Sequence, residues 1–432
     1  MNSLNKSPRY ISYEILISFI NKRSKLQQII NYHLTKQKLS DKDKSFITEI
    51  CYGVIRNYYF IEYLINKQSK QNHINKRLKI LIMIGVYQLK FLKSVPSYAA
   101  VNTSVHLSKI LFPYAKGFIN AILRNIDRDK INDSDIPINI QKSCPNWLYQ
   151  LYINDFGSEE TLNLINEQVK RPSHWIRIND DIKKIMNIFS ENNIDFTQYN
   201  YNTKYLSVKS LSHKIISELL SNGIIYIQSP SSGHVVDLLN PKEGDSIIDG
   251  CSSPGGKLTD MYFRCRKLKK LHSYEINYER YKLLKKNINI MSTDNISIFN
   301  KSFLECSNNN FNKILIDVPC SGTGSINKKP DIKILRKLEQ YKYFNEIQTS
   351  LLNHSAKILK SGYIVYSTCS LNNLENWNII DNFLHNNKNY KVSDISNLVP
   401  KNYIDKKGAL FIKPHEHKLD GIFAVRLTKL NA

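Results

Sequence analysis

The stretch that decides the fold is SIIDGCSSPGGK, residues 246–257. Its first residues form an apolar run that ends in Asp249, and a glycine-rich turn then leads into a helix that we expect to begin near Leu258. Such a turn lets a ligand approach the backbone, and the amino end of a helix favours an electron-rich group. The glycine spacing fits neither the G-x-G-x-x-G signature nor a P-loop. A ligand-binding turn and an ordinary tight turn both remain open at this point.

Three further apolar segments follow, with helical patterns between them. They are LHSYE at 271–275, ILID at 314–317 and YIVY at 363–366. Strands that alternate with helices predict a parallel, doubly wound sheet, so we expect a Rossmann-like domain over residues 241–432. Glu275 ends the second strand about twenty residues after the turn, where an acid in such folds hydrogen-bonds a ribose diol. The turn and Glu275 together favour a nucleoside cofactor.

Two of these strands are followed directly by a cysteine. The runs are DVPC at 317–320 and STCS at 367–370. The carboxyl ends of neighbouring parallel strands meet at one crevice, so Cys320 and Cys369 can reach the same substrate. Two thiols beside an aspartate, without metal-ligand spacing, suggest covalent chemistry on an electrophilic ring carbon. The alternative for each thiol is a buried, inert cysteine.

The front of the chain has a different texture. Apolar residues recur at helical spacing from Leu78 to Leu89 and again from Phe118 to Ile126, and Ser40 has the chemistry of a helix N-cap. We therefore expect an all-α bundle over residues 1–130. A polar linker and a small α+β connector, with strands near residues 175–178, 205–208 and 224–227, would occupy residues 131–240.

Composition narrows the class of protein. The 432 residues carry a net charge of +24, which makes a polyanion such as nucleic acid the natural partner, although an AT-rich coding sequence would also inflate lysine. Seven cysteines without a C-x-x-C pair argue against a disulfide framework and a zinc ribbon, and favour the cytoplasm. No apolar run reaches the length of a membrane span, and no His/Cys/Asp spacing predicts a metal site.

The motifs PGGK at 254–257, DVPC at 317–320 and TCS at 368–370, in that order, resemble the signature of RNA cytosine-C5 methyltransferases of the RsmB/NOP/NSUN family. The resemblance extends to the front of the chain. The segments LSDKD at 39–43, YGVIR at 52–56, GVYQL at 85–89 and FINAILR at 118–124 are similar to the NusB-like domain of the family's bacterial RsmB branch. This resemblance implies S-adenosyl-L-methionine as methyl donor and 16S ribosomal RNA, in the small subunit or its precursor, as substrate.

The resemblance also implies roles for four residues. Cys369 would be the nucleophile that adds to C6 of cytosine, and Cys320 would assist loss of the C5 proton and release of the enzyme. Asp317 would hydrogen-bond the cytosine edge and favour protonation at N3. Lys257 would lie close to Asp317, and its charge would favour thiolate at the site.

For the cofactor, the resemblance implies that the turn after the first strand lines the methionine and ribose side, with Glu275 on the ribose hydroxyls. One departure concerns the adenine side, where the family usually has an aspartate after the third strand and this chain has Ser302. The expected cofactor-binding residues are Cys251, Ser252, Ser253, Pro254, Gly255, Gly256, Lys257, Glu275, Ser302 and Asp317.

The target cytosine must leave its stack to meet a thiol and a methyl donor, so a looped or flipped base is implied. The helical domain is then most simply a second RNA-binding surface, with Arg56 and Arg124 as candidate contacts. Residues 328–331, KKPD, would lie at the mouth of the crevice, either as an RNA contact or as a solvated charge run. We expect no membrane partner and no metal, and a monomer.

Two rival functions remain from the sequence. A methyltransferase acting on an exocyclic amine would resemble this chain near Asp317, but such enzymes carry Pro-Pro-Tyr or Pro-Pro-Phe there, whereas this chain has Val318-Pro319-Cys320. A non-catalytic, NusB-like RNA-binding factor is the second rival. Binding alone requires neither Cys320 nor Cys369, so the two thiols together disfavour it.

Overall fold

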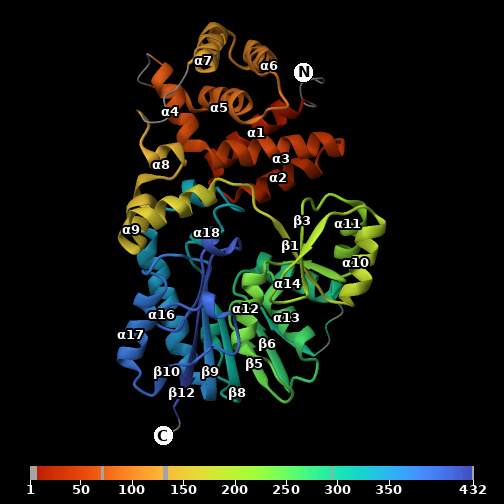
Figure 1. The fold of residues 1–432 in the computed structure, drawn as a ribbon, viewed down its shortest axis with the longest axis vertical. Coiled ribbons are helices and arrows are strands. Elements are labelled where there is room, and N and C mark those ends of the chain that lie inside the picture. Colours follow the sequence, from red (N-terminus) through yellow and green to blue (C-terminus); the bar gives the residue numbers. More distant parts are fainter. Residues whose placement is uncertain (1–6, 70–72, 130–134, 292, 294, 431–432) are drawn as a thin grey trace. The chain divides into compact units, whose positions relative to one another are not determined.

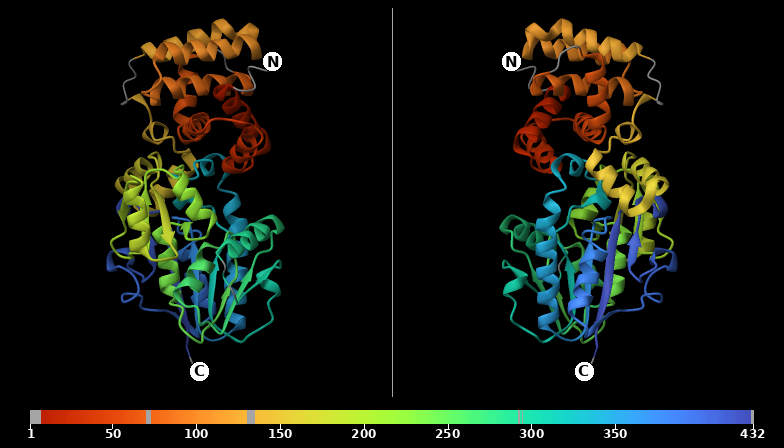
Figure 2. Two further views of the ribbon diagram at one scale, coloured as in Figure 1. Left: turned by 90° about the vertical axis from the view of Figure 1, so that its right-hand side faces the viewer. Right: turned by 90° about the vertical axis from the view of Figure 1, so that its left-hand side faces the viewer.

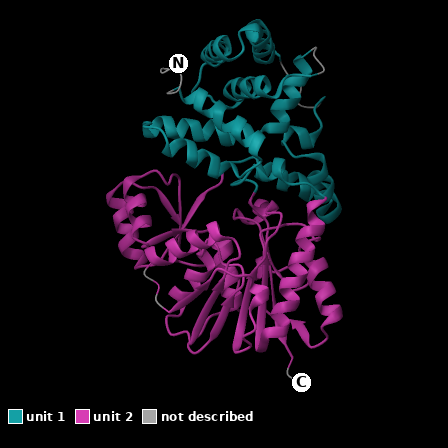
Figure 3. Cartoon of the chain, turned by 180° about the vertical axis from the view of Figure 1, so that it is seen from behind, with its two compact units in different colours: residues 1–170, 326–338 teal, residues 171–325, 339–432 magenta. Residues whose placement is uncertain are grey.

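The computed structural model describes residues 7–69, 73–129, 135–291, 293 and 295–430 (Figure 1). Contacts divide the chain into two units, residues 1–170 with 326–338 and residues 171–325 with 339–432 (Figure 3). The predicted boundary between residues 130 and 131 lies outside the described residues. The predicted division into residues 1–130, 131–240 and 241–432 stays a prediction, because contacts alone do not show which segments fold independently.

The first unit is built from helices, as expected from its apolar stripes, and residues 8–69 and 73–128 are mostly coiled ribbon in Figure 2. Its helices are α1 (Pro8–Lys22), α2 (Leu26–Thr35), α3 (Asp41–Arg56), α4 (Tyr58–Gln68), α5 (Lys76–Phe91), α6 (Ser97–Leu111), the 3-10 turn η2 (Pro113–Ala115), α7 (Lys116–Arg128), α8 (Ile138–Gln141), α9 (Asn146–Gln168) and α15 (Ile332–Leu335).

Local sequence accounts for two features of this bundle. The Ser40 side chain accepts a hydrogen bond from the Asp43 amide and caps α3, as its sequence predicted. Gly85 lies where α5 passes close to its neighbours, since a Cβ there would meet the Leu123 side chain at 2.8 Å and Ser104 Oγ at 2.9 Å. The absence of a side chain at this position therefore allows the helices to pack closely.

The inserted segment, residues 326–338, joins the core of the first unit. Lys333 Nζ donates to the carbonyl oxygens of Arg56 and Ser143, both at 2.7 Å, and Asp331 Oδ2 accepts from the Leu26 amide at 3.2 Å. Burial lowers the pKa of Lys333 to about 7. Residues 328–331, which the sequence suggested for the mouth of the crevice, therefore belong to a segment anchored in the helical unit.

One predicted RNA contact is corrected by this packing. Arg56 is buried, and its Nη2 donates to the carbonyl oxygen of Asn327 at 3.2 Å. Its guanidinium group therefore holds the inserted segment and does not face a solvent-borne ligand. Arg124 is exposed on α7, where its Nε donates to Asn120 Oδ1, and its contact with RNA stays a prediction.

The second unit begins with a small antiparallel sheet of strand order β2-β3-β1-β4. The strands expected near 175–178, 205–208 and 224–227 are present, and the short β2 is an additional strand that the sequence did not indicate. The elements are β1 (His174–Ile178), α10 (Ile182–Glu191), β2 (Phe196–Gln198), β3 (Tyr205–Val208), α11 (Lys214–Ser221) and β4 (Ile225–Ile227).

The main sheet has the order β10-β12-β9-β8-β5-β6-β7, with β11 paired to β12. Figure 1 labels β10, β12, β9, β8, β5 and β6 of this sheet. The ladder from β9 through β8, β5 and β6 to β7 is parallel, which confirms the doubly wound expectation. The strands β10, β11 and β12 join by antiparallel pairs, so the sheet is mixed. Antiparallel neighbours need no crossover helix between them. The strands are β5 (Ser246–Asp249), β6 (Lys270–Tyr274), β7 (Ile296–Phe299), β8 (Phe311–Asp317), β9 (Leu359–Thr368), β10 (Tyr390–Val392), β11 (Leu410–Ile412) and β12 (Ile422–Lys429).

Both faces of this sheet are buried. Ile247 and Leu315 pack into one hydrophobic cluster, whereas their neighbours Ile248, Ile314 and Ile316 pack into another. This alternation follows from the period-2 orientation of side chains along a strand. The associated helices are α12 (Pro230–Leu239), α13 (Gly256–Arg264), α14 (Tyr278–Ile290), α16 (Gln340–Ile358), α17 (Trp377–Asn386) and α18 (Pro414–His417), with 3-10 turns η4 (Phe303–Glu305), η5 (Thr323–Ser325) and η6 (Lys401–Tyr403).

The order of the strands positions the candidate site. The chain adds β6 and β7 on one side of β5 and then places β8 and β9 on the other side. Such a switch point leaves a crevice at the carboxyl ends of the two central strands, where ligands of open α/β sheets bind. Among the described residues, no helix is long and apolar enough to cross a bilayer.

Candidate active site

Two aspartates end the strands on either side of the switch point. Asp249 is the last residue of β5 and Asp317 is the last residue of β8, and the two strands are parallel neighbours. Ser367 of β9 lies in register with Asp317. The ends of β5, β8 and β9 therefore contribute side chains to one edge of the sheet, as the strand pattern predicted.

Asp317 has two polar partners. Its Oδ2 forms an ion pair with Lys257 Nζ at 2.6 Å, and its Oδ1 accepts a hydrogen bond from Ser367 Oγ at 2.8 Å. The side chain of Asp317 is 34% exposed, which leaves it accessible to a ligand. Lys257 comes from the first turn of α13 and Ser367 from β9. The carboxylate at the end of β8 is therefore held by one side chain from the helix after β5 and one from the neighbouring strand.

The two thiols that follow β8 and β9 lie together. Cys320 Sγ and Cys369 Sγ are 3.3 Å apart. The hydrogen bond to Cys369, followed by burial, raises the pKa of Cys320 well above that of an ordinary thiol. A thiol that donates to a neighbouring sulfur keeps its own proton and favours thiolate on the partner. Either thiol can donate this hydrogen bond, so the unequal roles of the two cysteines stay a prediction.

Lys257 interacts electrostatically with both Asp317 and Cys369. Burial alone would lower the pKa of its ammonium group, but Asp317 and, to a smaller degree, Cys369 and Asp249 leave that pKa raised. Lys257 therefore stays charged inside the site. A fixed cation near a thiol favours the thiolate form, which is the nucleophilic one.

Asp249 has the opposite environment. Its side chain is 1% exposed, and neither carboxylate oxygen has a hydrogen-bond partner at standard geometry among the described residues. Burial, with a contribution from Asp317, raises its pKa to about 7, although Lys257, the Cys251 amide and the Ser252 hydroxyl partly offset this rise. A buried carboxylate without full compensation is a position where a bound cation would be stabilised.

The turn between Asp249 and α13 is closely packed. A Cβ on Gly250 would meet the Phe303 ring at 2.9 Å, and Gly255 has a φ of 102°, which L side chains rarely adopt. Ser252 Oγ donates to the Asp249 carbonyl at 2.9 Å, and Asn287 Nδ2 donates to the Pro254 carbonyl at 2.8 Å. The turn ends at Gly256, the first residue of α13, so the predicted turn of residues 251–257 lies at a helix amino end beside Asp249.

Glu275 follows β6 and is 4% exposed. Its Oε1 accepts from the Asn277 amide at 2.9 Å, and its Oε2 pairs with Arg280 Nε at 3.4 Å. Arg280 Nη2 in turn donates to the Ser253 carbonyl at 2.7 Å, and Ser253 Oγ donates to the Arg280 carbonyl at 2.9 Å. Glu275 and the turn that holds Ser253 are therefore joined through Arg280, which supports their prediction as parts of one ligand site.

Two other predicted cofactor residues have structural partners of their own. Ser302 Oγ accepts from the Leu304 amide at 3.2 Å, and Glu305 completes a capping box at the start of η4. Burial, together with the nearby carboxylates of Asp249, Asp317 and Glu275, raises the pKa of Cys251. Cys251 is therefore a neutral thiol that lines the turn, and the adenine contact of Ser302 stays a prediction.

The structure thus brings together the predicted catalytic residues, which are Lys257, Asp317, Cys320 and Cys369. Sequence reasoning did not single out Asp249, although it ends β5 as Asp317 ends β8, and that shared pattern was a usable signal. It also missed Ser367, which stands within the STCS motif.

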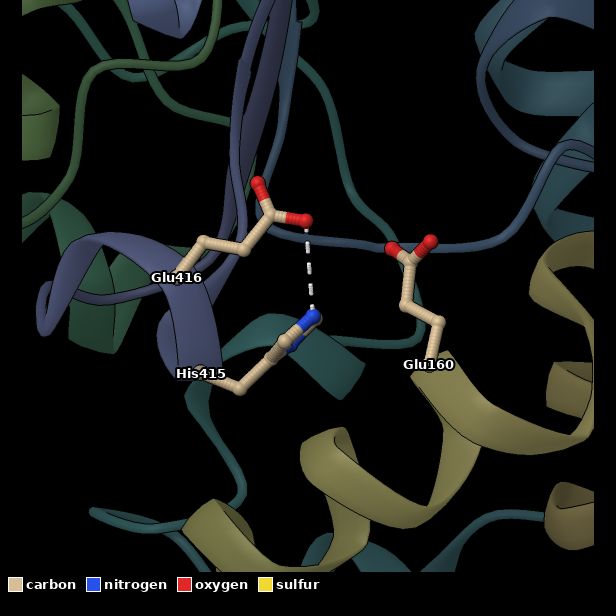
Figure 4. Close-up of side chains that lie close together, drawn as sticks. All are labelled: Glu160, His415 and Glu416. Atoms are coloured by element: carbon tan, nitrogen blue, oxygen red, sulfur yellow. Dashed lines mark ion pairs between the residues drawn. The ribbon is translucent and has the colours of Figure 1, made fainter.

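A separate acid–imidazole pair lies on α18. His415 Nε2 and Glu416 Oε1 are 3.5 Å apart, and Figure 4 draws this contact as a dashed line. Glu416 also pairs with Lys413 Nζ at 3.0 Å, and these contacts lower the pKa of its carboxyl against the effect of burial. Glu160, the third side chain drawn, belongs to the first unit. The expected absence of a metal site stays a prediction.

The chain matches two protein families. The family described as 16S rRNA methyltransferase RsmB/F matches residues 236–428, and the NusB family matches residues 6–128. The probable ribosomal RNA small subunit methyltransferase B of Bacillus subtilis (strain 168) is 26% identical, with 98% of this chain and 99% of the relative aligned. The corresponding protein of Synechocystis sp. is 29% identical over 98% of this chain and 99% of the relative.

Solved structures show the same fold. The crystal structure of PH0851 covers 98% of this chain and 99% of its own chain, with a TM-score of 0.83 and 21% identity. A methyltransferase homologue from Pyrococcus horikoshii covers 69% of this chain and 100% of its own, with a TM-score of 0.60 and 22% identity. The chain therefore carries a domain that matches the family of 16S rRNA methyltransferases RsmB/F over residues 236–428, and in front of it a domain that matches the NusB family over residues 6–128.

Proposed function

We propose that this chain transfers a methyl group from S-adenosyl-L-methionine to C5 of a cytosine in 16S ribosomal RNA through a covalent adduct between Cys369 and C6. The observation that carries the proposal is the pair of thiols, 3.3 Å apart, next to a sheet edge where Asp317 is paired with Lys257. Two thiols in one site suit a reaction that must form a carbon–sulfur bond and later break it.

The residues at the end of β5 fit the proposed cofactor. The buried carboxylate of Asp249 lacks a full countercharge, and the ammonium group of a methionine moiety would supply one. Glu275, held beside the turn through Arg280, suits ribose hydroxyls. When bound, S-adenosyl-L-methionine supplies an electrophilic methyl group on a sulfonium. The chain's own residues would bind it, orient it and exclude water.

The first proposed step uses Cys369 and Asp317. C5 of cytosine is a poor nucleophile, and addition of the Cys369 thiolate to C6 converts the ring to an enamine that is nucleophilic at C5. Asp317 would hydrogen-bond the edge of the base and favour a proton at N3, which draws electrons from C6. Lys257 keeps a positive charge next to Asp317 and stabilises the thiolate before attack.

The release step uses Cys320. After methylation, the Cys320 thiol would lose its proton to solvent, and the resulting thiolate would accept the proton on C5. The electrons of that C–H bond form the C5–C6 double bond, the C6–Sγ bond breaks, and Cys369 leaves as a thiolate. Before attack, the hydrogen bond to Cys369 helps to keep Cys320 protonated. Because Cys369 is a neutral thioether in the adduct, this cause of the raised pKa disappears when Cys320 is needed as a base.

Ribosomal RNA as substrate rests on the family and on charge. The two named relatives are described as ribosomal RNA small subunit methyltransferases, and the chain has a net charge of +24, which suits a polyanionic partner. The NusB-family domain would then provide a second RNA-binding surface, with Arg124 as an exposed candidate. The cytoplasm, where ribosomal RNA is assembled into subunits, is the proposed location.

Labelled S-adenosyl-L-methionine and small-subunit ribosomal RNA test the proposal. We expect the label at C5 of a cytosine after complete RNA digestion, no label with Cys369→Ala, and a denaturation-resistant protein–RNA species with Cys320→Ser. Thermal melting of both variants is the folding control.

Each alternative function predicts a different result in this experiment. Label on an exocyclic nitrogen would reject C5 chemistry in favour of the amine-methyltransferase alternative. RNA binding without any label transfer by the wild-type protein would favour the non-catalytic RNA-binding alternative. Full activity in Cys369→Ala would reject Cys369 as the nucleophile.

A further inference from the structure

A buried carboxylate lies behind the two thiols. Glu375 is 0% exposed, in the segment between β9 and α17. Its Oε1 accepts from the Ser321 amide at 2.8 Å, and its Oε2 accepts from the Ser321 hydroxyl. Ser321 is the residue after Cys320. A buried carboxylate is expensive unless donors surround it, so this arrangement fixes Ser321 closely.

Gln348 forms a hydrogen bond to the residue that precedes Cys320. This buried residue of α16 donates from Nε2 to the Pro319 carbonyl at 2.9 Å and to Glu375 Oε1 at 3.1 Å. Pro319 is the residue before Cys320. Glu375 therefore holds Ser321, the residue after Cys320, and Gln348 holds the backbone carbonyl of Pro319, the residue before it.

The same residues are tied to the segment that carries Cys369. Asn372 Nδ2 donates to Glu375 Oε2 at 3.4 Å and to Ser370 Oγ at 2.6 Å. The Gly324 amide donates to the Cys369 carbonyl at 2.9 Å, which links the segment after Cys320 to Cys369 itself. One buried hydrogen-bond network that includes Glu375 therefore links the two segments that carry the thiols.

We propose that Glu375 is a positioning residue that, with Gln348, holds Cys320 in the place from which it removes the C5 proton. This inference rests on the proposed function, because it assigns a role within the release step. The contacts of Glu375 and Gln348 with the residues flanking Cys320 are direct, whereas Cys369 is reached through Ser370 and the backbone. Loosening them should therefore impair release more than methyl transfer. Misplacement of a reacting group by about 1 Å can slow a step by about a hundredfold.

Two variants test this role. Glu375→Gln replaces one acceptor oxygen by an amide donor that faces other donors, and Gln348→Met keeps the side-chain volume but removes the donor to Pro319. We expect steady-state turnover to fall by about tenfold or more, while methyl transfer in a single turnover stays within about threefold of wild type. The methylated RNA should remain attached to the protein, as it should in Cys320→Ser. Accumulation of that adduct on a denaturing gel is a readout that general loss of structure would not produce.

A matched control lies on the same helix. Ser355 is buried on α16 and donates to the Leu351 carbonyl at 2.8 Å, away from the thiol network. Ser355→Ala should lose neither turnover nor release. If Glu375→Gln fails to fold, as judged by thermal melting, Gln348→Met carries the test.

The outcomes separate this inference from the proposed function. Absence of C5 label with wild-type protein would reject the proposed function itself. If wild type labels C5 and Cys320→Ser traps the adduct, then the inference is overturned by either of two results in folded Gln348→Met. One is normal turnover without adduct, and the other is an equal loss of methyl transfer and release.

Discussion

The ends of β5 and β8 carry the same residue type in opposite environments. Asp317 is 34% exposed, with Lys257 Nζ at 2.6 Å and Ser367 Oγ at 2.8 Å. Asp249 is 1% exposed, and its carboxylate oxygens have no partner at hydrogen-bond geometry among the described residues. The difference fits the two proposed roles, in which Asp317 contacts the base and Asp249 receives the positive charge of the cofactor.

The largest effect is expected when the paired aspartate is neutralised. Asp317→Asn removes the carboxylate charge proposed for the cytosine edge and leaves the half-buried Lys257 ammonium without its ion-pair partner. The single-turnover rate of methyl transfer should fall by roughly 10²–10⁴-fold, the range typical for a lost acid–base group. Quenched-flow measurement with saturating cofactor reports this rate. A loss below about threefold would remove Asp317 from the chemistry.

A smaller effect on binding is expected from the buried aspartate. Asp249→Asn removes the countercharge proposed for the cofactor's ammonium group, and a hydrogen bond between charged groups of this kind contributes about 1.5–3 kcal/mol. The dissociation constant for S-adenosyl-L-methionine, measured by calorimetry, should rise about 10- to 100-fold. Unchanged affinity would show that Asp249 does not face the cofactor's charge.

The same variant gives a pH signature in the cofactor-free protein. Burial raises the pKa of Asp249 from 3.8 to about 7, so between these values the folded state keeps a proton that the unfolded state has lost. This group therefore contributes a stability that is greatest at low pH and is lost as the pH rises towards 7. The Asp249→Asn variant has no ionisable group at this position, so its stability does not fall for this reason as the pH rises. Its melting temperature relative to wild type should increase from pH 5 to pH 8, and a constant difference would contradict the raised pKa.

The smallest effect concerns the second partner of Asp317. Ser367→Ala removes one hydrogen bond to Oδ1 but leaves the ion pair with Lys257 intact. One neutral donor contributes about 0.5–1.5 kcal/mol, so methyl transfer should slow by about 3- to 10-fold. Single-turnover rates of methyl transfer for Ser367→Ala are compared with those of wild type and of Asp317→Asn. A loss as large as that of Asp317→Asn would mean that the serine, and not the ion pair, orients the carboxylate.

Local sequence was enough for the scaffold of this comparison. The apolar runs ending at Asp249 and Asp317 predicted two parallel strands, and the placement of Cys320 and Cys369 after strands predicted that the thiols would share an edge. The helical bundle was likewise readable from its apolar stripes. These features depend on the spacing of apolar residues and on the turn residues between them, which are local properties of a chain.

Features that depend on distant partners were not predictable in this way. Arg56 was a plausible RNA contact until the inserted segment brought the Asn327 carbonyl to its guanidinium group. Similarly, nothing near Glu375 in the sequence indicates that its carboxylate accepts from Ser321, because that contact joins residues 54 positions apart. The antiparallel entry of β12 also depends on where the chain returns to the sheet, not on the residues of the strand itself.

The most direct test of the central claim maps the covalent bond. Cys320→Ser protein is incubated with S-adenosyl-L-methionine and small-subunit ribosomal RNA, digested with nuclease and trypsin, and sequenced by mass spectrometry. The unequal roles of the two thiols predict a methylated cytosine nucleotide attached to the peptide that contains Cys369. An adduct on any other residue, or no adduct with an RNA that wild-type protein methylates at C5, would contradict them.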